Sequence, residues 1–273
     1  MGQPPRLARA AASARLALQT RIGEPELALL PLLVDPARVA IDVGASVGVY
    51  TSALVRLSSR VVAFEPVPPL SRRLVHTFPD VLVLPLAASD EAGMQALHVP
   101  RREGKDLHPR ASLRADADPD LEHDQILVPT CRLDSLDLGP VGFIKVDVEG
   151  HELAVMRGTR GLLERDRPIL LVESEIRHGD GPAALGSVMG EMGYDGCFIH
   201  QGRLQELDAF RPDMQWVPPV QLGTRGRRIN QLKWLVKPST ALARRLVNNF
   251  IFVPTEQQPA RMDRLRQALA ADA

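Results

Sequence analysis

The sequence predicts an α/β protein whose sheet is mainly parallel and is covered by helices on both faces. Short apolar runs of strand length alternate with longer stretches of helical spacing from residue 39 to residue 200. Strands that alternate with helices form parallel sheets, because each helix carries the chain back across the sheet. Three of the runs also end in acidic residues or glycine, and such sheets bind ligands at the carboxyl ends of their strands.

Seven apolar runs have the length and composition of strands. They are Val39–Val43, Val61–Phe64, Val81–Pro85, Phe143–Val148, Ile169–Glu173, Cys197–His200 and Phe250–Val253. The last two are expected to close the sheet as an antiparallel pair. The expected helices are Val47–Leu57, Leu70–His76, Glu152–Leu163 and Ala183–Met192.

The chain is expected to have four parts. They are an N-terminal helical extension (1–36), the core (37–200), an irregular basic insertion (201–248), and a last strand with a C-terminal helix (249–273). In the extension, Leu7, Ala11, Ala14 and Leu18 recur at helical spacing, which predicts an amphipathic helix packed on the core.

Two stretches break the alternation. Residues 101–124 are charged and are expected to form a long surface insertion, flanked by short strands at Met94–Val99 and Ile126–Leu133. Between Thr224 and Leu246 there are seven basic residues and no acid. This second stretch is either a patch for an anionic acceptor or a solvated surface.

The composition excludes several classes of partner. The 33 basic and 33 acidic residues balance, so the chain has no general attraction to nucleic acid, and an aromatic content of 4% leaves few platforms for stacking bases. No apolar run approaches the roughly 18 residues of a transmembrane helix. Two distant cysteines make no disulfide framework and favour a reducing, cytoplasmic location. A homodimer is left open.

The first strand runs into a glycine turn, Asp42-Val43-Gly44-Ala45-Ser46-Val47-Gly48. Glycine suits positions where the backbone takes positive φ or approaches a ligand closely. The pattern lacks the G-x-G-x-x-G phosphate cradle of dinucleotide sites, because Ser46 stands at the second glycine. S-adenosylmethionine carries no phosphate, so we expect this turn, with Asp42, Gly44, Ala45, Ser46 and Gly48, to hold that cofactor.

The second strand ends in Glu65, 17 residues beyond Gly48. A carboxylate there can accept hydrogen bonds from both hydroxyls of a ribose, whereas the alternative is a structural turn with a surface glutamate. Ser89 and Asp90 follow the third strand. Either side chain can accept a hydrogen bond from the exocyclic amine of adenine. The alternative is that the two residues form a simple turn.

The chain resembles the FkbM family of S-adenosylmethionine-dependent methyltransferases over roughly residues 39–196. The resemblance is carried by Asp42-Val43-Gly44-Ala45, Phe64-Glu65-Pro66, Leu133-Asp134-Ser135-Leu136, Ile144-Lys145-Val146-Asp147-Val148-Glu149-Gly150-His151-Glu152, Arg167-Pro168 with Glu173, and Met192-Gly193-Tyr194. It implies a class I methyltransferase (Rossmann-like) fold and usually O-methylation of a sugar or natural-product hydroxyl.

By this resemblance residues 37–200 are the methyltransferase core, and Asp42, Gly44 and Glu65 contact the cofactor. The chain departs from the family at Ser46, where members often carry Asn, although a serine can still hydrogen-bond there. Residues 201–248 match nothing familiar and are a candidate acceptor-binding segment. The implied acceptor is a small molecule or glycan with a free hydroxyl.

An aliphatic hydroxyl is a poor nucleophile and gains from a base or a metal ion. Asp147 and Glu173 end two strands that are expected to be neighbours. Their carboxylates can hold Mg²⁺, or they can orient loops and substrate hydroxyls without a metal.

Glu149 and His151 are the candidate bases, since both follow the same strand as Asp147. The alternatives are an acid favoured by the helix N-terminus for Glu149 and a cap for His151. Lys145 lies inside the strand and is expected to pair with one of these acids, because a buried lysine without a partner is costly. It is a further catalytic candidate.

Two other functions remain open. A nicotinamide-dependent oxidoreductase is disfavoured by the missing glycine and by the absence of a Tyr-x-x-x-Lys pair. A non-catalytic domain that binds S-adenosylmethionine is disfavoured by the intact cluster of acids.

Overall fold

The computed structural model describes residues 24–117, 120–178, 181–215 and 246–271. Within these residues the main sheet has eight strands in the order β11-β10-β12-β9-β8-β1-β2-β3. Their bounds are β1 Val39–Val43, β2 Val61–Phe64, β3 Leu82–Leu84, β8 Val141–Val146, β9 Ile169–Glu173, β10 Tyr194–His200, β11 Arg203–Glu206 and β12 Asn249–Pro254.

The sheet is mixed, which corrects the expected seven-stranded, mainly parallel sheet. Strands β3, β2, β1, β8 and β9 run parallel, whereas β12, β10 and β11 are joined to β9 and to one another in antiparallel fashion. The expected closing pair is confirmed, because β10 and β12 are antiparallel neighbours. The additional strand, β11, follows a tight turn in which Gln201 and Gly202 have φ of 53° and 74°.

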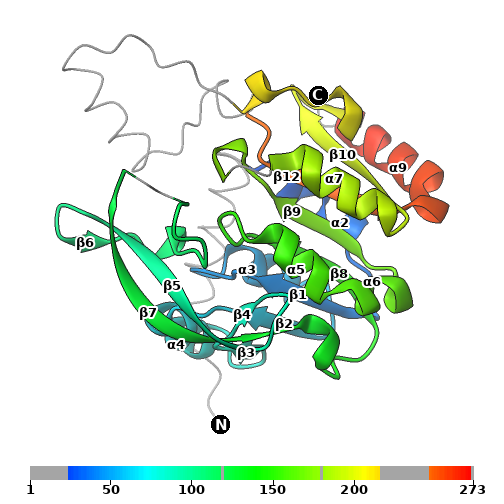
Figure 1. Ribbon diagram of the computed structural model, residues 1–273. Coiled ribbons are helices and arrows are strands. Elements are labelled where there is room, and N and C mark those ends of the chain that lie inside the picture. Colours follow the sequence, from blue (N-terminus) through cyan, green and yellow to red (C-terminus); the bar gives the residue numbers. More distant parts are fainter. Residues whose placement is uncertain (1–23, 118–119, 179–180, 216–245, 272–273) are drawn as a thin grey trace.

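Helices cover both faces of the sheet (Figure 1). Their bounds are α2 Glu26–Leu33, α3 Val49–Leu54, α4 Pro68–Thr77, α5 Glu152–Gly158, α6 Arg160–Asp166, α7 Gly181–Glu191 and α9 Gln258–Ala271. Apolar side chains of α5, α6 and α7 share one core with alternate residues of the central strands. Those of α2, α3 and α9 share a second core with the intervening residues. The period of two along each strand therefore assigns its residues to one core or the other.

The expected helix Glu152–Leu163 is broken into α5 and α6. A Cβ atom on Gly158 would lie 1.9 Å from the carbonyl oxygen of Ser89, so this helix packs its backbone directly against the turn after the third strand. Only glycine permits that approach.

A second sheet of four strands, in the order β4-β7-β5-β6, is built from the charged stretch and its flanks. It comprises β4 Ala87–Ala88, β5 Gly93–Arg102, β6 Lys105–Asp106 and β7 Glu122–Cys131. Strands β5 and β7 form a long antiparallel ladder with β6 at its tip (Figure 1). The short helix η1, His108–Arg110, follows β6 and returns to the carboxyl edge of the main sheet, where Pro109 lines both cavities described below.

The amphipathic helix expected around Leu7–Leu18 and the basic residues Arg225–Arg245 lie outside the described residues. No helix of the described residues is long and apolar enough to cross a membrane. The boundaries between the four expected parts stay predictions.

Candidate active site

Two adjoining cavities open at the carboxyl ends of β1, β2, β8 and β9. The first, which we call the apolar cavity, is lined mainly by apolar side chains, with Glu65 and His151 among its polar residues. The second, which we call the polar cleft, has a volume of about 540 Å³ and includes Lys145 and Glu173. The residues that line both are Gly44, Ser46, Pro109, Asp147 and Glu149.

The glycine turn after β1 lies at the boundary between the two cavities, and its residues Gly44 and Ser46 line both. Gly44 has φ of +80°, and a Cβ atom on it would lie 1.8 Å from the backbone oxygen of Asp147. Gly48 has φ of +85°, and its Cβ atom would collide with Phe78 at 2.6 Å. Both positions therefore require glycine, and the turn brings bare backbone to the cavity walls.

Asp42 and Ala45 belong to the polar cleft and not to the apolar cavity. Asp42 is buried at 2% exposure, and the hydroxyl of Thr51 in α3 donates to it at 2.5 Å. Burial raises the pKa of Asp42 against the opposing hydrogen bond from Thr51. Asp42 thus fastens the start of α3 to β1 beneath the glycine turn.

Glu65 is held in place by the backbone. Its two carboxyl oxygens accept the amide protons of Ser46 at 2.7 Å and Val67 at 2.8 Å. Burial raises the pKa of Glu65 to about 7, although both amides favour the ionised form. The carboxyl group is therefore fixed in orientation at the wall of the apolar cavity, with lone pairs left for a ligand.

Ser89 and Asp90 do not line either cavity. The hydroxyl of Ser89 lies 2.9 Å from His151 Nε2, and Asp90 forms an ion pair with Arg157 at 3.2 Å. His151, which immediately precedes α5, does line the apolar cavity. Burial lowers the pKa of His151, so its imidazole is neutral near pH 7.

A row of polar side chains crosses the face of the sheet that packs on α2 and α3. Asp42 and Lys145 are opposite each other in β1 and β8, and Glu173 and Asn249 are opposite each other in β9 and β12. Asn249, which immediately precedes the last predicted strand, Phe250–Val253, and opens β12, was not among the predicted site residues.

Lys145 is fully buried in this row. Its ammonium donates to Asn249 Oδ1 at 2.9 Å and lies 4.9 Å from the ring centroid of Tyr50. The expected ion pair with an acid is therefore not formed within the described residues. The charge is instead satisfied by an amide oxygen, the carbonyl of Val146 and an aromatic face.

Asp147 and Glu173 follow neighbouring strands and their carboxyl groups face each other. Burial raises the pKa of Asp147 to about 6, while the charge of Lys145 opposes the rise. Burial and the charge of Asp147 raise the pKa of Glu173 well above its usual range. Ionisation of Asp147 therefore disfavours ionisation of Glu173, as expected for two carboxyls in one poorly hydrated site.

A metal at this pair would need further ligands. Among the described residues no group of three or more His, Cys, Asp or Glu side chains could hold a metal ion. Mg²⁺ favours six oxygen ligands, so an ion held by Asp147 and Glu173 would depend on water and on oxygens of an acceptor.

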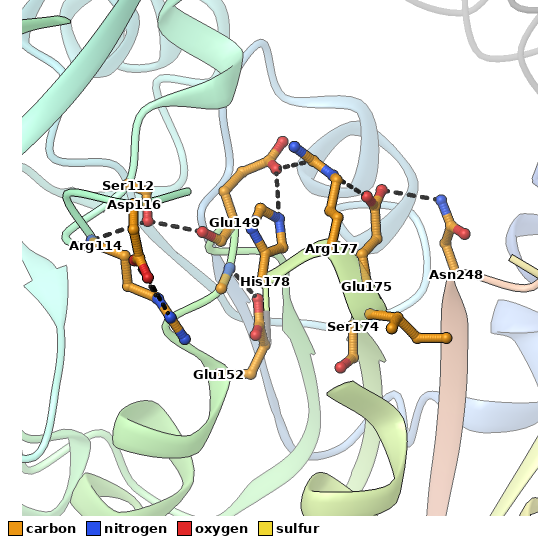
Figure 2. A network of polar contacts seen from close by, with 12 residues as sticks. Ser112, Arg114, Asp116, Glu149, Glu152, Ser174, Glu175, Arg177, His178 and Asn248 are labelled. Atoms are coloured by element: carbon orange, nitrogen blue, oxygen red, sulfur yellow. Dashed lines mark hydrogen bonds and ion pairs between the residues drawn. The ribbon is translucent and has the colours of Figure 1, made fainter. Parts of the chain in front are cut away.

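Glu149 lines both cavities, and its carboxylate is held by Arg177 and His178 (Figure 2). Its carboxylate pairs with Arg177 at 2.6 Å and lies 3.3 Å from His178 Nε2. Burial opposes ionisation, but His178 and then Arg177 outweigh it and lower the pKa of Glu149. Its φ of 50° and the hydrogen bond from Ser112 to its carbonyl fix the backbone.

Arg177 also pairs with Glu175, which accepts from Asn248 at 3.0 Å (Figure 2). This chain of contacts joins the ends of β8, β9 and β12 around the polar cleft. The sequence showed no motif spacing that would single out Arg177, His178 or Asn248.

Comparison with known proteins assigns the family. The family model described as Methyltransferase FkbM domain matches residues 42–196, which is more than half of the chain. No curated protein matches the chain.

Three solved structures illustrate the similarity. A methyltransferase FkbM from Methylobacillus flagellatus KT is 17% identical, with 81% of this chain and 45% of that chain covered and a TM-score of 0.45. A SAM dependent methyltransferase from Aquifex aeolicus is 15% identical, with coverages of 67% and 86% and a TM-score of 0.39. Magnesium protoporphyrin IX methyltransferase (ChlM) from Synechocystis PCC 6803 with bound SAM is 11% identical, with coverages of 72% and 79% and a TM-score of 0.37.

The chain spans less than half the length of the Methylobacillus protein. The match over residues 42–196 includes the glycine turn, Glu65 and the acids after β8. The chain belongs to the FkbM methyltransferase family, a family of S-adenosylmethionine-dependent enzymes.

Proposed function

We propose that the protein is an S-adenosylmethionine-dependent O-methyltransferase that acts on a free hydroxyl of a small-molecule or glycan acceptor. One observation carries the proposal. The apolar cavity and the polar cleft share a boundary made by Gly44, Ser46, Asp147 and Glu149. A donor in the first cavity can thus present a methyl group to an acceptor in the second.

The residues around the apolar cavity fit the donor. Its ribose hydroxyls can donate to Glu65, which the amides of Ser46 and Val67 already orient. Gly44 lets the backbone after β1 pack directly against the carbonyl of Asp147, which brings the glycine turn and Asp147 together at the cavity wall. When bound, S-adenosylmethionine supplies an electrophilic methyl group on a sulfonium.

The residues around the polar cleft fit a hydroxyl acceptor. The facing carboxyls of Asp147 and Glu173 can accept the hydroxyl proton as its oxygen becomes a nucleophile. Glu149 is already paired with Arg177, so it serves better as a fixed negative charge at the boundary than as the base. Lys145, tied to Asn249, supports the neighbouring strands. Alternatively, Asp147 and Glu173 would hold a Mg²⁺ ion, which would lower the pKa of the acceptor hydroxyl.

The proposal is tested by methyl transfer from isotope-labelled S-adenosylmethionine to a panel of glycosides and hydroxylated natural products. The expected result is a product one methyl group heavier, with the label on oxygen. The Asp147→Asn variant, which keeps the shape of the side chain, should form this product far more slowly. Label transferred to nitrogen or carbon, in preference to oxygen, would overturn the proposal.

A further inference from the structure

Glu65 stands at the ribose position that the proposed function assigns. The same cavity is also lined by the apolar side chains of Val67, Leu86, Ala88 and Leu97. These apolar side chains suit the faces of a purine but offer no partner to its polar edge. Two histidines, His108 and His151, line this cavity without also lining the polar cleft. His108 lies 3.6 Å from Asp106 in the half-exposed tip of the second sheet, whereas the ring of His151 is fixed by the buried hydroxyl of Ser89.

The protons around His151 can be assigned from its partners. Asp90 is an acceptor, because Arg157 holds it ionised, and it receives the single hydroxyl proton of Ser89 at 3.2 Å. Ser89 Oγ must therefore accept a proton at its 2.9 Å contact with His151 Nε2. The neutral imidazole carries its proton on Nε2, and Nδ1 keeps a lone pair.

Among the described residues, Nδ1 of His151 has no hydrogen-bond partner. It is also not one of their fully buried polar atoms without a partner, so it keeps some accessible surface. Since His151 lines the apolar cavity and its Nε2 is engaged by Ser89, Nδ1 is the ring nitrogen left to contact a ligand there. The close packing of Gly158 against the Ser89 carbonyl and the ion pair of Arg157 with Asp90 hold α5 and this turn together. Together these contacts fix the direction of the imidazole.

We propose that His151 recognises the adenine of the cofactor by accepting a hydrogen bond from its exocyclic amine at Nδ1. Ser89 is then a positioning residue that fixes the tautomer of His151. This inference rests on the proposed function. It assigns His151 to cofactor recognition and not to proton transfer. It assigns Ser89 to holding the side chain of His151 and not to direct contact with adenine. The amine donates to the lone pair, whereas the carbonyl oxygen of hypoxanthine at the same place would be repelled by it.

The test is a calorimetric titration with S-adenosylhomocysteine and with S-inosylhomocysteine, which differ at this amine. The wild-type protein should prefer the adenine compound by about tenfold or more, since a site that leaves a polar atom unpaired discriminates strongly. His151→Leu should weaken binding of the adenine compound and bring the ratio to within about threefold. Ser89→Ala, which removes only one hydroxyl group, should also reduce the preference for the adenine compound.

Two controls separate recognition from general damage. Ser71→Ala removes a buried hydroxyl in α4 that bonds to the carbonyl of Pro68, and it should leave the ratio unchanged. Glu65→Gln should weaken both compounds alike. If the wild type binds both compounds equally, or if His151→Leu keeps the preference, the inference is wrong while the proposed function stands. If S-adenosylhomocysteine does not bind at all, both fail.

Discussion

The two cavities are built in different ways. The apolar cavity depends on backbone geometry, because Gly44 and the amides that hold Glu65 belong to short stretches at the ends of β1 and β2. The polar cleft depends on side chains that converge from β1, α3, η1, β8, β9 and the segments just before α2 and β12. The difference explains why a short sequence motif predicts the donor site, whereas no comparable motif predicts the acceptor site.

The charges differ as well. In the apolar cavity Glu65 is the carboxyl that does not also line the polar cleft. In the polar cleft the pKa values of Asp147 and Glu173 depend on the charges of Lys145 and Glu149. Changes in the first cavity should therefore affect donor affinity, and changes in the second should affect turnover.

The largest effect is expected from Gly44→Ala. The new Cβ atom would lie 1.8 Å from the oxygen of Asp147, so the turn must open and S-adenosylhomocysteine binding should be lost. Gly104→Ala is the matched control, because its φ is +74° but nothing lies within 4 Å of the added atom. Calorimetric titration and thermal unfolding of both variants measure the effect. Normal affinity in Gly44→Ala would show that the turn does not set the donor site.

The next largest effect is expected from Asp147→Asn and Glu173→Gln. Loss of a general base typically costs about 10²–10⁴-fold in turnover, so kcat should fall by that order while the affinity for S-adenosylhomocysteine changes little. Steady-state kinetics and calorimetry on the same samples separate the two quantities. If EDTA abolishes wild-type turnover and Mg²⁺ restores it, the carboxyls act as metal ligands and not as the base.

A smaller effect is expected from Glu65→Gln, at about 1–3 kcal/mol of donor affinity. The wild-type affinity should also depend on pH. Burial raises the pKa of Glu65 to about 7, and ribose hydroxyls donate to the ionised form, so binding releases a proton at lower pH. Affinity for S-adenosylhomocysteine should rise with pH up to about 7 and then level off. Titrations from acid to alkaline pH check this, and an equal slope in Glu65→Gln would contradict it.

The smallest effect on binding and turnover is expected from Glu26→Gln in α2, which should change the pH dependence of stability instead. Burial raises the pKa of Glu26 from 4.5 to about 8. Between these values the unfolded chain is ionised and the folded one is not, so the wild type loses stability as pH rises, by at most about 1.4 kcal/mol per unit. Denaturant unfolding should find Glu26→Gln more stable than wild type at pH 8 and little different at pH 4. A constant difference across this range would refute the assignment.

The sequence predicted the parallel half of the sheet because its strands are continuous apolar runs with ligand-binding residues at their ends. It predicted the pairing of β10 with β12 but missed β11, whose four residues Arg203–Glu206 show no apolar run. It also treated the charged stretch as a surface insertion, although η1 within it reaches both cavities. Short polar strands are set by their partners, which a local pattern does not contain.

The candidate site shows the same limit. Gly44, Glu65 and Asp147 each end a strand, so topology alone brings them to one edge. The partners that decide their chemistry come from elsewhere, such as Arg177 for Glu149 and Asn249 for Lys145. Because these contacts depend on side-chain direction across distant segments, the sequence paired Lys145 with an acid, whereas the structure pairs it with Asn249.

The most direct measurement is a calorimetric titration of the purified protein with S-adenosylhomocysteine and, in parallel, with NAD. The account predicts binding of S-adenosylhomocysteine with micromolar affinity and no comparable binding of NAD. Binding of NAD in preference to S-adenosylhomocysteine would contradict it and favour an oxidoreductase. Binding of neither would contradict the assignment of the apolar cavity to a nucleoside donor.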